Sequence, residues 1–432
     1  MTVLRRSGFL PLLLWTFAGA AAAQDEPVAY RLPLLDSTNL DRCLAADGEF
    51  VVEGDVLACK QGVGFLRAHH RLTDFVLELK WRASSPDVRG AVCFRSPLPE
   101  PGNSGPERYR IRLQPGQAGD LEGTAATGKP DSIQSGQWNA LRLSVVGRTA
   151  SLEINGQSIW TFDELAEPSG VLGLYADVTG GGRLEFRDLV VTELGFRSLS
   201  NGTDLTGWEG AGGDAALCWK VEDGLLMCTG QKGPWLRSCE EFDDFNLRLE
   251  YRLRPGGNSG VYLRVPASGN HHGADAGIEV QILDDAADRY KTLKPYQYTG
   301  SLYAIVAADP RVGRPVGEWN TLEIQCCGTR YRVTHNGVDV IVADEQAAPE
   351  LQQRRVAGYL GLQNHSEEVW FRHLRIGPPD CGHAASAEGA GGGNESDTPA
   401  SEPEAGQESD PAAAPDAGTE PESPGNAHTQ QP

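Results

Sequence analysis

The same series of short segments occurs twice along the chain, in the same order and with similar spacing. The matched segments are FVVEGDVLAC (50–59) with WKVEDGLLMC (219–228), FLRA (65–68) with WLRS (235–238), TDFVLELKWR (73–82) with DDFNLRLEYR (243–252), GQWNALRLSVVG (136–147) with GEWNTLEIQCCG (317–328), GVLGLYAD (170–177) with GYLGLQNH (358–365), and LEFRDLVV (184–191) with VWFRHLRI (369–376). This period is far longer than the roughly 20–50 residues of a solenoid repeat, so we interpret the chain as a duplicated domain.

The matched segments alternate apolar and polar residues. In FNLRLEYRL (245–253) the apolar side chains face one way, and Asn246, Arg248, Glu250 and Arg252 face the other. This period of two predicts a half-buried strand. Similar runs recur between Gly, Pro and Asn turns, and Asn336-Gly337 is a favoured two-residue hairpin turn. The sequence therefore predicts an all-β chain in which each copy is a sandwich of two antiparallel sheets.

The N-terminal residues have the composition of a targeting segment. Arg5-Arg6 is followed by an apolar run that ends in Ala21-Ala22-Ala23, which predicts a signal peptide over residues 1–23. The run is too short for a comfortable membrane span, so we expect no membrane insertion after cleavage. An uncleaved N-terminal anchor is the alternative. A secreted or periplasmic location is the expectation.

The C-terminal residues 381–432 are rich in Ala, Gly, Ser, Pro and Glu and have almost no large apolar side chain. Such a segment cannot bury enough surface to offset its ordering entropy, which predicts a disordered acidic tail. The two domains are then expected at residues 28–194 and 195–378.

The net charge of the chain excludes one class of partner. Lys and Arg total 38 against 59 Asp and Glu, and the formal net charge of −21 argues against nucleic-acid binding.

Cys218 and Cys228 flank a predicted hairpin, where a disulfide is plausible in an exported protein. Two free buried thiols are the alternative. Cys326-Cys327 are adjacent in a predicted strand and are not expected to point inward together.

Comparison of the two copies predicts where chemistry resides. In the second copy, GIEVQILDD (277–285) places Glu279 and Gln281 on one face of a strand. Asp284 is out of phase unless a bulge intervenes. The first copy has Arg110 and Arg112 at the equivalent positions, and a carboxylate in acid–base catalysis would not tolerate this exchange. We therefore predict a polar site that only the second copy retains, although an exposed structural strand would also fit.

The second copy resembles a known family. The motifs GGNSGVYLR (256–264), GIEVQILDD, TGSLY (299–303) and GYLGLQNH, followed by VWFRHLRI, are similar to those of the 3-keto-disaccharide hydrolases, also described as 3-keto-glucoside 1,2-lyase/2-hydroxyglucal hydratases. The resemblance covers about Ser198 to Ile376, whereas about Tyr30 to Leu194 shares only the scaffold motifs. It implies two tandem concanavalin A-like jelly rolls and a carbohydrate partner.

The chemistry that the resemblance implies starts with the 3-keto group of a sugar, which acidifies the hydrogen on C2. Loss of that proton, β-elimination at C1 and addition of water give net hydrolysis. We expect Glu279 as the base, His365 as the acid and Arg264 as the stabiliser of the enolate. The expected substrate-binding residues are Asn258, Gln281, Asp284, Tyr303 and Gln363.

A divalent cation could replace Arg264, with candidate ligands Glu279, Asp284 and His365 and the loop pair His271-His272. The sequence has no strict metal-spacing motif, so no cofactor is firmly predicted. Two other functions stay open. One is a lectin-like carbohydrate-binding protein that could use aromatic residues such as Trp208, Trp235 and Tyr296, and the other is a structural module of an exported assembly.

Overall fold

The structure is a computed structural model that describes residues 28–35, 40, 42–47, 49–96, 109–128, 133 and 135–381. The predicted signal peptide and all of the predicted tail except Cys381 lie outside these residues. Both copies of the duplicated domain belong to one compact unit. Among the described residues no helix has the length and hydropathy of a membrane span.

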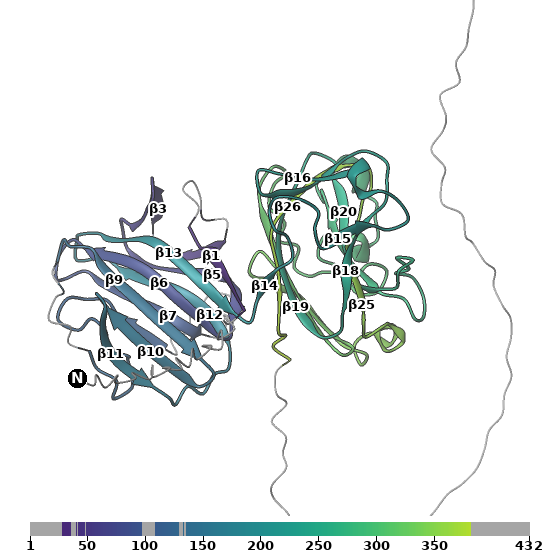
Figure 1. The fold of residues 1–432 in the computed structure, drawn as a ribbon. Coiled ribbons are helices and arrows are strands. Elements are labelled where there is room, and N and C mark those ends of the chain that lie inside the picture. Colours follow the sequence, from purple (N-terminus) through teal and green to yellow (C-terminus); the bar gives the residue numbers. More distant parts are fainter. Residues whose placement is uncertain are drawn as a thin grey trace, which may run out of the picture. The chain divides into compact units, whose positions relative to one another are not determined.

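The first copy folds as a sandwich of two antiparallel sheets (Figure 1). The larger sheet has the order β11 (Gln157–Phe162), β10 (Thr149–Ile154), β9 (Asn139–Val146), β6 (Phe75–Ala83), β13 (Leu184–Leu194), β4 (Val56–Cys59) and β3 (Phe50–Glu53), with β1 (Ala29–Pro33) also paired to β13. The smaller sheet has the order β2 (Cys43–Asp47), β5 (Val63–Leu72), β12 (Gly170–Asp177), β7 (Arg89–Ser96) and β8 (Tyr109–Arg112).

The second copy repeats this topology strand for strand. Its larger sheet has the order β24 (Val338–Ala343), β23 (Arg330–His335), β22 (Asn320–Cys327), β19 (Phe245–Leu253), β26 (Glu368–Gly377), β17 (Leu225–Thr229) and β16 (Trp219–Glu222), with β14 (Arg197–Ser198) on β26. Its smaller sheet has the order β15 (Trp208–Gly210), β18 (Leu236–Phe242), β25 (Gly358–Leu362), β20 (Asn258–Val265) and β21 (Ile278–Leu283). The prediction of an all-β chain with two tandem jelly-roll sandwiches is therefore confirmed.

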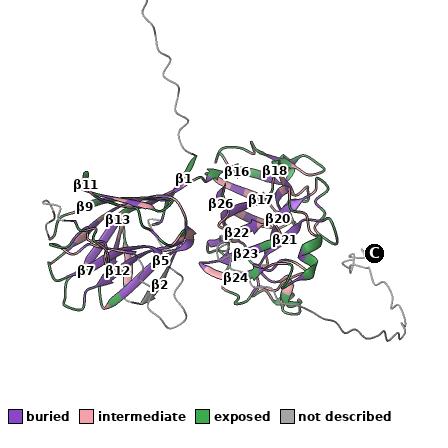
Figure 2. Ribbon diagram, turned by 90° about the horizontal axis from the view of Figure 1, so that it is seen from below, coloured by how far each residue is buried: buried purple, intermediate pink, exposed green. Residues whose placement is uncertain are grey.

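The core of each sandwich consists of the inward-facing apolar side chains of its two sheets. Strand β6 shows the predicted alternation, with every second residue buried. Figure 2 shows buried residues concentrated on the strands and exposed residues on many of the connections. Short 3₁₀ segments occur in the connections of the second copy, at Ala215–Leu217, Asp288–Tyr290, Pro295–Gln297 and Pro349–Gln353.

The polar face of β19 is also buried, in contrast to the half-buried strand that the alternation predicts. Arg248 and Glu250 are only 2% and 1% exposed. Arg248 Nη1 donates to Glu193 of the first sandwich at 2.8 Å, and Glu250 accepts from Arg42 Nε at 2.5 Å. Polar side chains of the first copy thus cover a face that the sequence pattern alone assigns to solvent.

Of the two outcomes that the sequence leaves open for Cys218 and Cys228, the structure has the two free buried thiols. The disulfide joins Cys327 to Cys381, whereas Cys218 and Cys228 are buried free thiols. The reason is the hairpin register, in which Trp219 rather than Cys218 lies opposite Cys228. Cys326 is a buried free thiol beside the bonded Cys327, as expected for adjacent strand positions. Cys381 is therefore covalently attached to the second sandwich, although the sequence assigned it to the tail.

Candidate active site

The outer face of the smaller sheet in the second sandwich carries a group of polar side chains. Strand alternation directs Val280 and Ile282 of β21 into the core, so Glu279 and Gln281 lie on the opposite face. Tyr262 of β20 is paired with Glu279, and Gly260 is paired with Gln281. The face predicted to hold the site is thus formed by two hydrogen-bonded neighbouring strands.

Two glycines provide the space that this face needs. A Cβ atom on Gly260 would meet the Glu279 carboxylate, and a Cβ atom on Gly361 would meet the ring of Trp235, both far inside the 3.0 Å that real Cβ contacts respect. Only glycine therefore permits the Glu279 carboxylate to lie over β20 and the Trp235 ring to lie over β25.

The carboxyl group of Glu279 is buried, and its two oxygen atoms have different surroundings. The residue is 3% exposed. Its Oε2 lies 3.3 Å from Nε2 of His271, whereas its Oε1 has no hydrogen-bond partner within the described part of the chain. Burial disfavours the charged form and raises the pKa of Glu279 to about 8. A pKa in this range suits a group that both takes and gives protons near neutral pH.

Aromatic rings continue from Glu279 along the face. The Trp235 ring meets Tyr262 edge-on with centroids 5.2 Å apart, and Tyr262 stacks on His271 at 4.9 Å. The His272 ring lies 4.0 Å from His271 and 6.0 Å from Tyr303. These rings give the site apolar surface beside a polar floor, a combination typical of small-molecule sites.

His271 enters the site from the loop between β20 and β21, and the sequence analysis considered it, together with His272, only as a candidate metal ligand. Its backbone carbonyl accepts from Arg354 Nη1 at 3.0 Å, which connects the loop to the segment before β25. Burial lowers the pKa of both His271 and His272. The available signal was an Asn-His-His-Gly run just before the strand of Glu279, but its side-chain direction depends on the folded loop.

Four of the predicted substrate-binding residues lie on or beside this face. Gln281 is 5% exposed, and the Tyr303 amide donates to the Glu279 carbonyl at 2.8 Å. Asn258 Oδ1 and Gln363 Oε1 are buried oxygens without a hydrogen-bond donor among the described residues. Together with Glu279 Oε1 they make a set of acceptors that a ligand bearing hydroxyl groups could satisfy.

Arg264 does not belong to this site, and its predicted role in stabilising an enolate is wrong. The residue sits at a register shift of β20 with φ 51°, and its side chain is fully buried. Its guanidinium donates to the carbonyl of Asp243 at 2.6 Å and to Asp244 Oδ1 at 2.8 Å. Arg95 of the first sandwich makes the same kind of contacts, with the Thr73 carbonyl and Asp74, so this arginine is part of the shared scaffold.

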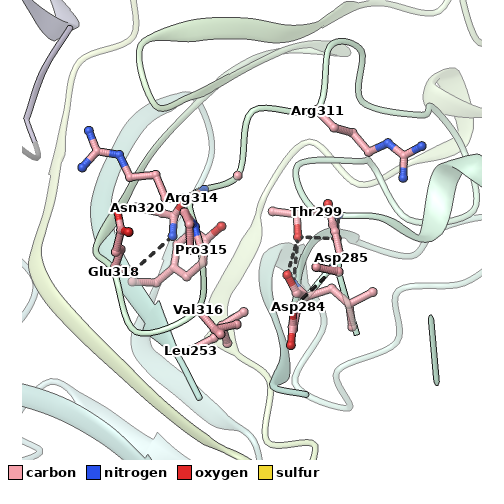
Figure 3. A pocket seen from close by; sticks show the side chains of 14 residues that line it. Leu253, Asp284, Asp285, Thr299, Arg311, Arg314, Pro315, Val316, Glu318 and Asn320 are labelled. Atoms are coloured by element: carbon pink, nitrogen blue, oxygen red, sulfur yellow. Dashed lines mark hydrogen bonds between the residues drawn. The ribbon is translucent and has the colours of Figure 1, made fainter. Parts of the chain in front are cut away.

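His365 and Asp284 also have positions unlike those expected. The side chain of His365 is 55% exposed, and its ring lies 3.2 Å from Glu367. His365 follows Gly361, which is paired with Tyr262, by four residues along the chain. Asp284 accepts from the Gly256 amide at 2.7 Å and lines a separate cavity of about 530 Å³. Figure 3 shows Asp284, Asp285 and Thr299 on one side of this cavity and Arg314, Pro315 and Glu318 on the other.

The predicted metal ligands come together only in part: Glu279 and the pair His271-His272 lie side by side, whereas Asp284 and His365 have other partners. Glu279 contacts His271, His365 contacts Glu367, and Asp284 contacts backbone amides. Within the described residues no three His, Cys, Asp or Glu side chains are grouped as metal ligands usually are.

The equivalent face of the first sandwich is filled differently. Cys93 pairs with Arg110 in the same register as Tyr262 with Glu279, which confirms the alignment of these positions. Arg110 lies 4.3 Å over the ring of Tyr175 and 3.5 Å from Glu122. An arginine thus replaces the buried carboxyl group, and its charge and packing occupy the face.

Both copies of the duplicated domain match the same family model. The family model described as a 3-keto-alpha-glucoside-1,2-lyase-like domain matches residues 15–192 and again residues 195–377. A 3-keto-disaccharide hydrolase of Bacteroides thetaiotaomicron is 25% identical over 249 residues, which cover 47% of this chain and 84% of that protein.

The chain is also similar to proteins of known structure. A putative glycosyl hydrolase of Parabacteroides distasonis has 23% identity and a TM-score of 0.37, and the match covers 43% of this chain and 94% of that one. A carbohydrate-binding module, CBM66 of Bacillus subtilis, has 15% identity and a TM-score of 0.28 over 35% of this chain and 96% of that one.

Proposed function

This chain belongs to the 3-keto-alpha-glucoside-1,2-lyase-like family, and we propose that its second sandwich cleaves 3-keto-glycosides at the face around Glu279. The observation that carries the proposal is the environment of Glu279, a buried carboxyl group with a pKa raised to about 8 and one oxygen without a partner. Structural carboxylates of this chain are paired instead, as Glu193 is with Arg248 and Arg375.

The proposed reaction begins at C2 of the sugar. The 3-keto group makes the C2 hydrogen acidic, and Glu279 Oε1 removes it. The electron pair moves into an enediolate, and the C1 substituent leaves by β-elimination. Addition of water to the resulting glucal completes a net hydrolysis. Burial raises the pKa of the Tyr262 hydroxyl well above its usual range, so Tyr262 stays protonated and can donate a hydrogen bond to the developing oxyanion.

Substrate binding follows from the remaining side chains of the face. Asn258 Oδ1 and Gln363 Oε1 would accept hydrogen bonds from sugar hydroxyl groups, because the described protein groups supply them with none. The Trp235 ring would pack against the C–H face of the sugar, as aromatic residues commonly do at carbohydrate sites. The first sandwich, with Arg110 at the position of Glu279, would contribute scaffold rather than catalysis.

The decisive experiment is turnover of a panel of 3-keto-glucosides by the mature protein, with product identification by NMR. We expect release of the aglycone together with a 3-keto-glucal or 3-keto-glucose. Glu279→Gln should abolish turnover, whereas Glu122→Gln, at the matching face of the first sandwich, should retain it. Parallel reactions with EDTA would show whether a divalent cation takes part.

A second function has one observation in its favour. The ring series from Trp235 to Tyr303 would also serve a lectin-like protein that binds sugars without reaction. Binding of unoxidised glycans together with no turnover of any 3-keto-glycoside would favour this function.

Export is part of the proposal, because the N-terminal composition has the features of a signal peptide. N-terminal sequencing of the protein recovered from the periplasm or the medium should begin at Gln24. A chain that keeps residues 1–23 and sediments with membranes would instead indicate an N-terminal anchor.

A further inference from the structure

We propose that Asn364 is a positioning residue of the site, which fixes the separation between the Trp235 ring and the Gln363 side chain. This role rests on the proposed function, in which Trp235 packs against the sugar and Gln363 accepts a hydrogen bond from one of its hydroxyl groups. Asn364 is not among the predicted site residues. It acts through the two segments that it connects, without touching the sugar.

Strands β18 and β25 separate at the point where the site begins. Their last residue pair on this side is Leu236 with Leu362. The next residue at each strand end, Trp235 and Gln363, is outside the paired register. The two ends are therefore no longer held by the backbone hydrogen bonds that keep adjacent strands about 4.8 Å apart.

In the first sandwich the equivalent strands, β5 and β12, stay paired beyond this point, with Tyr175 opposite Phe65. Phe65 matches Trp235 in the duplicated sequence, but it is only 3% exposed, and Tyr175 packs against it. Trp235, in contrast, is partly exposed. Continuous pairing thus closes this face in the first sandwich, whereas separation of the strands keeps it open in the second.

The position of Asn364 differs between the copies in the same way. The pairing register aligns it with Ala176, which lies opposite Gly64 in the first sandwich. Alanine has no side-chain donor, and none is needed there, because the backbone itself joins the two strands. An amide side chain is therefore present only in the copy where the strands separate.

The side chain of Asn364 takes the place of the missing backbone bonds. Its Nδ2 donates to the carbonyl oxygen of Gln231 at 2.9 Å and to that of Gly233 at 3.3 Å. Its Oδ1 accepts from the Ser366 amide at 2.8 Å and from Cys228 Sγ at 3.3 Å. One side chain thus ties the segment that leads into β18 to the segment that leaves β25.

Each of these segments is also held on its other side. The Gln363 amide donates to the Gly260 carbonyl at 2.9 Å, and the Gln363 carbonyl accepts from Ser259 Oγ at 2.9 Å. The carbonyl of Pro234 accepts from Trp219 Nε1 at 3.0 Å. These contacts fix the two ends to different strands, β20 and β16, and Asn364 joins the ends to each other.

Asn364→Ala tests the proposal, and it should fold because the first sandwich has alanine at this position. Loss of the Nδ2 hydrogen bonds should let Trp235 move relative to Gln363 and raise KM for a 3-keto-glucoside about tenfold. The value of kcat should stay within about threefold of wild type, because the Glu279 carboxyl group is unchanged. A merely structural role would lower the active fraction, and hence kcat, without changing KM, and this result would overturn the proposal.

Asn364→Asp separates the two ends of the amide. It keeps an oxygen that can accept from the Ser366 amide but loses the donor, so its KM should rise as in Asn364→Ala, and a wild-type KM would contradict the proposal. Asn201→Ala is the matched control, since Asn201 also closes a loop through both ends of its amide, with Asp204 at 2.7 Å and the Thr203 amide at 2.9 Å. Its KM and kcat should equal those of wild type.

A measurement without substrate distinguishes failure of this role from failure of the proposed function. In ¹H–¹⁵N NMR spectra of the full chain, the indole N–H signal of Trp235, assigned with Trp235→Phe, should shift in Asn364→Ala and stay in place in Asn201→Ala. An unmoved signal in Asn364→Ala would refute the positioning role even if turnover is observed. A shifted signal in a protein that turns over no 3-keto-glycoside would support the positioning role and refute only the proposed substrate.

Discussion

The Glu279 carboxylate occupies the space that a Cβ atom on Gly260 would fill. The neighbouring strand is therefore as much a part of the site as Glu279 itself. Gly260→Ala should displace the carboxylate from its position beside His271 and lower kcat/KM by about 100-fold or more, because misplaced proton-transfer groups lose most of their effect. Steady-state kinetics on a 3-keto-glucoside would measure this loss.

Gly313→Ala is the matched control for Gly260→Ala. A Cβ atom at residue 313 would meet only His335, at an ordinary 3.7 Å, and its backbone needs no positive φ. This variant should keep the wild-type kcat/KM. Full activity in Gly260→Ala, with unchanged circular dichroism, would mean that the carboxylate does not need its present position.

Stability should depend on pH in a way that reports the burial of Glu279. Its folded pKa of about 8 is above the ordinary value of a glutamate, so the folded state binds a proton more tightly than the unfolded state. The resulting stabilisation is complete below about pH 4 and is lost as pH rises toward 8. Glu279→Gln removes this dependence. The Glu279→Gln variant should have a free energy of unfolding roughly several kcal/mol higher than wild type at pH 9 and nearly the same as wild type at pH 5.

Urea denaturation at pH 5 and pH 9 would test this prediction. Glu240→Gln serves as control, because Glu240 has a side chain 54% exposed and pairs with the surface residue Arg197. An equal change of stability at both pH values for Glu279→Gln would show that the folded carboxyl group is not held neutral.

Glu193, a buried carboxylate of the first copy, should make the stability of the protein sensitive to acid. Burial alone would raise the pKa of Glu193, but Arg375 and Arg248 lower it to about 2. The stabilisation is therefore present above the unfolded pKa and is lost as pH falls from about 4 toward 2. Glu193→Gln leaves the buried Arg375 without its carboxylate partner and Arg248 with Glu323 alone, and it should lower the free energy of unfolding by about 3–5 kcal/mol at pH 7.

Thermal and urea unfolding at pH 7 and pH 3 would measure the effect of Glu193→Gln. The variant and wild type should differ much less at pH 3, where wild-type Glu193 has lost part of its advantage. The exposed pair of Arg197 and Glu240 is again the control, with an expected cost of at most about 1 kcal/mol. A Glu193→Gln variant as stable as wild type at pH 7 would contradict the buried-pair account.

Sequence periodicity was sufficient to predict the two-sheet sandwiches and the strand face on which Glu279 lies, because strand alternation is a local property. It failed at Arg264, where a register shift turns the side chain away from the face expected for it. It also failed for the polar face of β19, since Arg248 finds its partner Glu193 in the other copy. His271 was named only as a candidate metal ligand, and its contact with Glu279 was not predicted, because a loop side chain acquires its direction only from tertiary contacts, here with Arg354 and Tyr262.

The disulfide between Cys327 and Cys381 closes a loop of 54 residues and attaches the last described residue to β22. Cys381→Ser should lower the free energy of unfolding by about 2–4 kcal/mol, chiefly because the unfolded chain regains conformational freedom. Cys239→Ser, which changes an exposed free thiol, should leave stability unchanged. Peptide mapping without reduction should show the Cys327–Cys381 link in wild type. A map that instead links Cys218 to Cys228, with no loss of stability in Cys381→Ser, would restore the pairing that the sequence suggested.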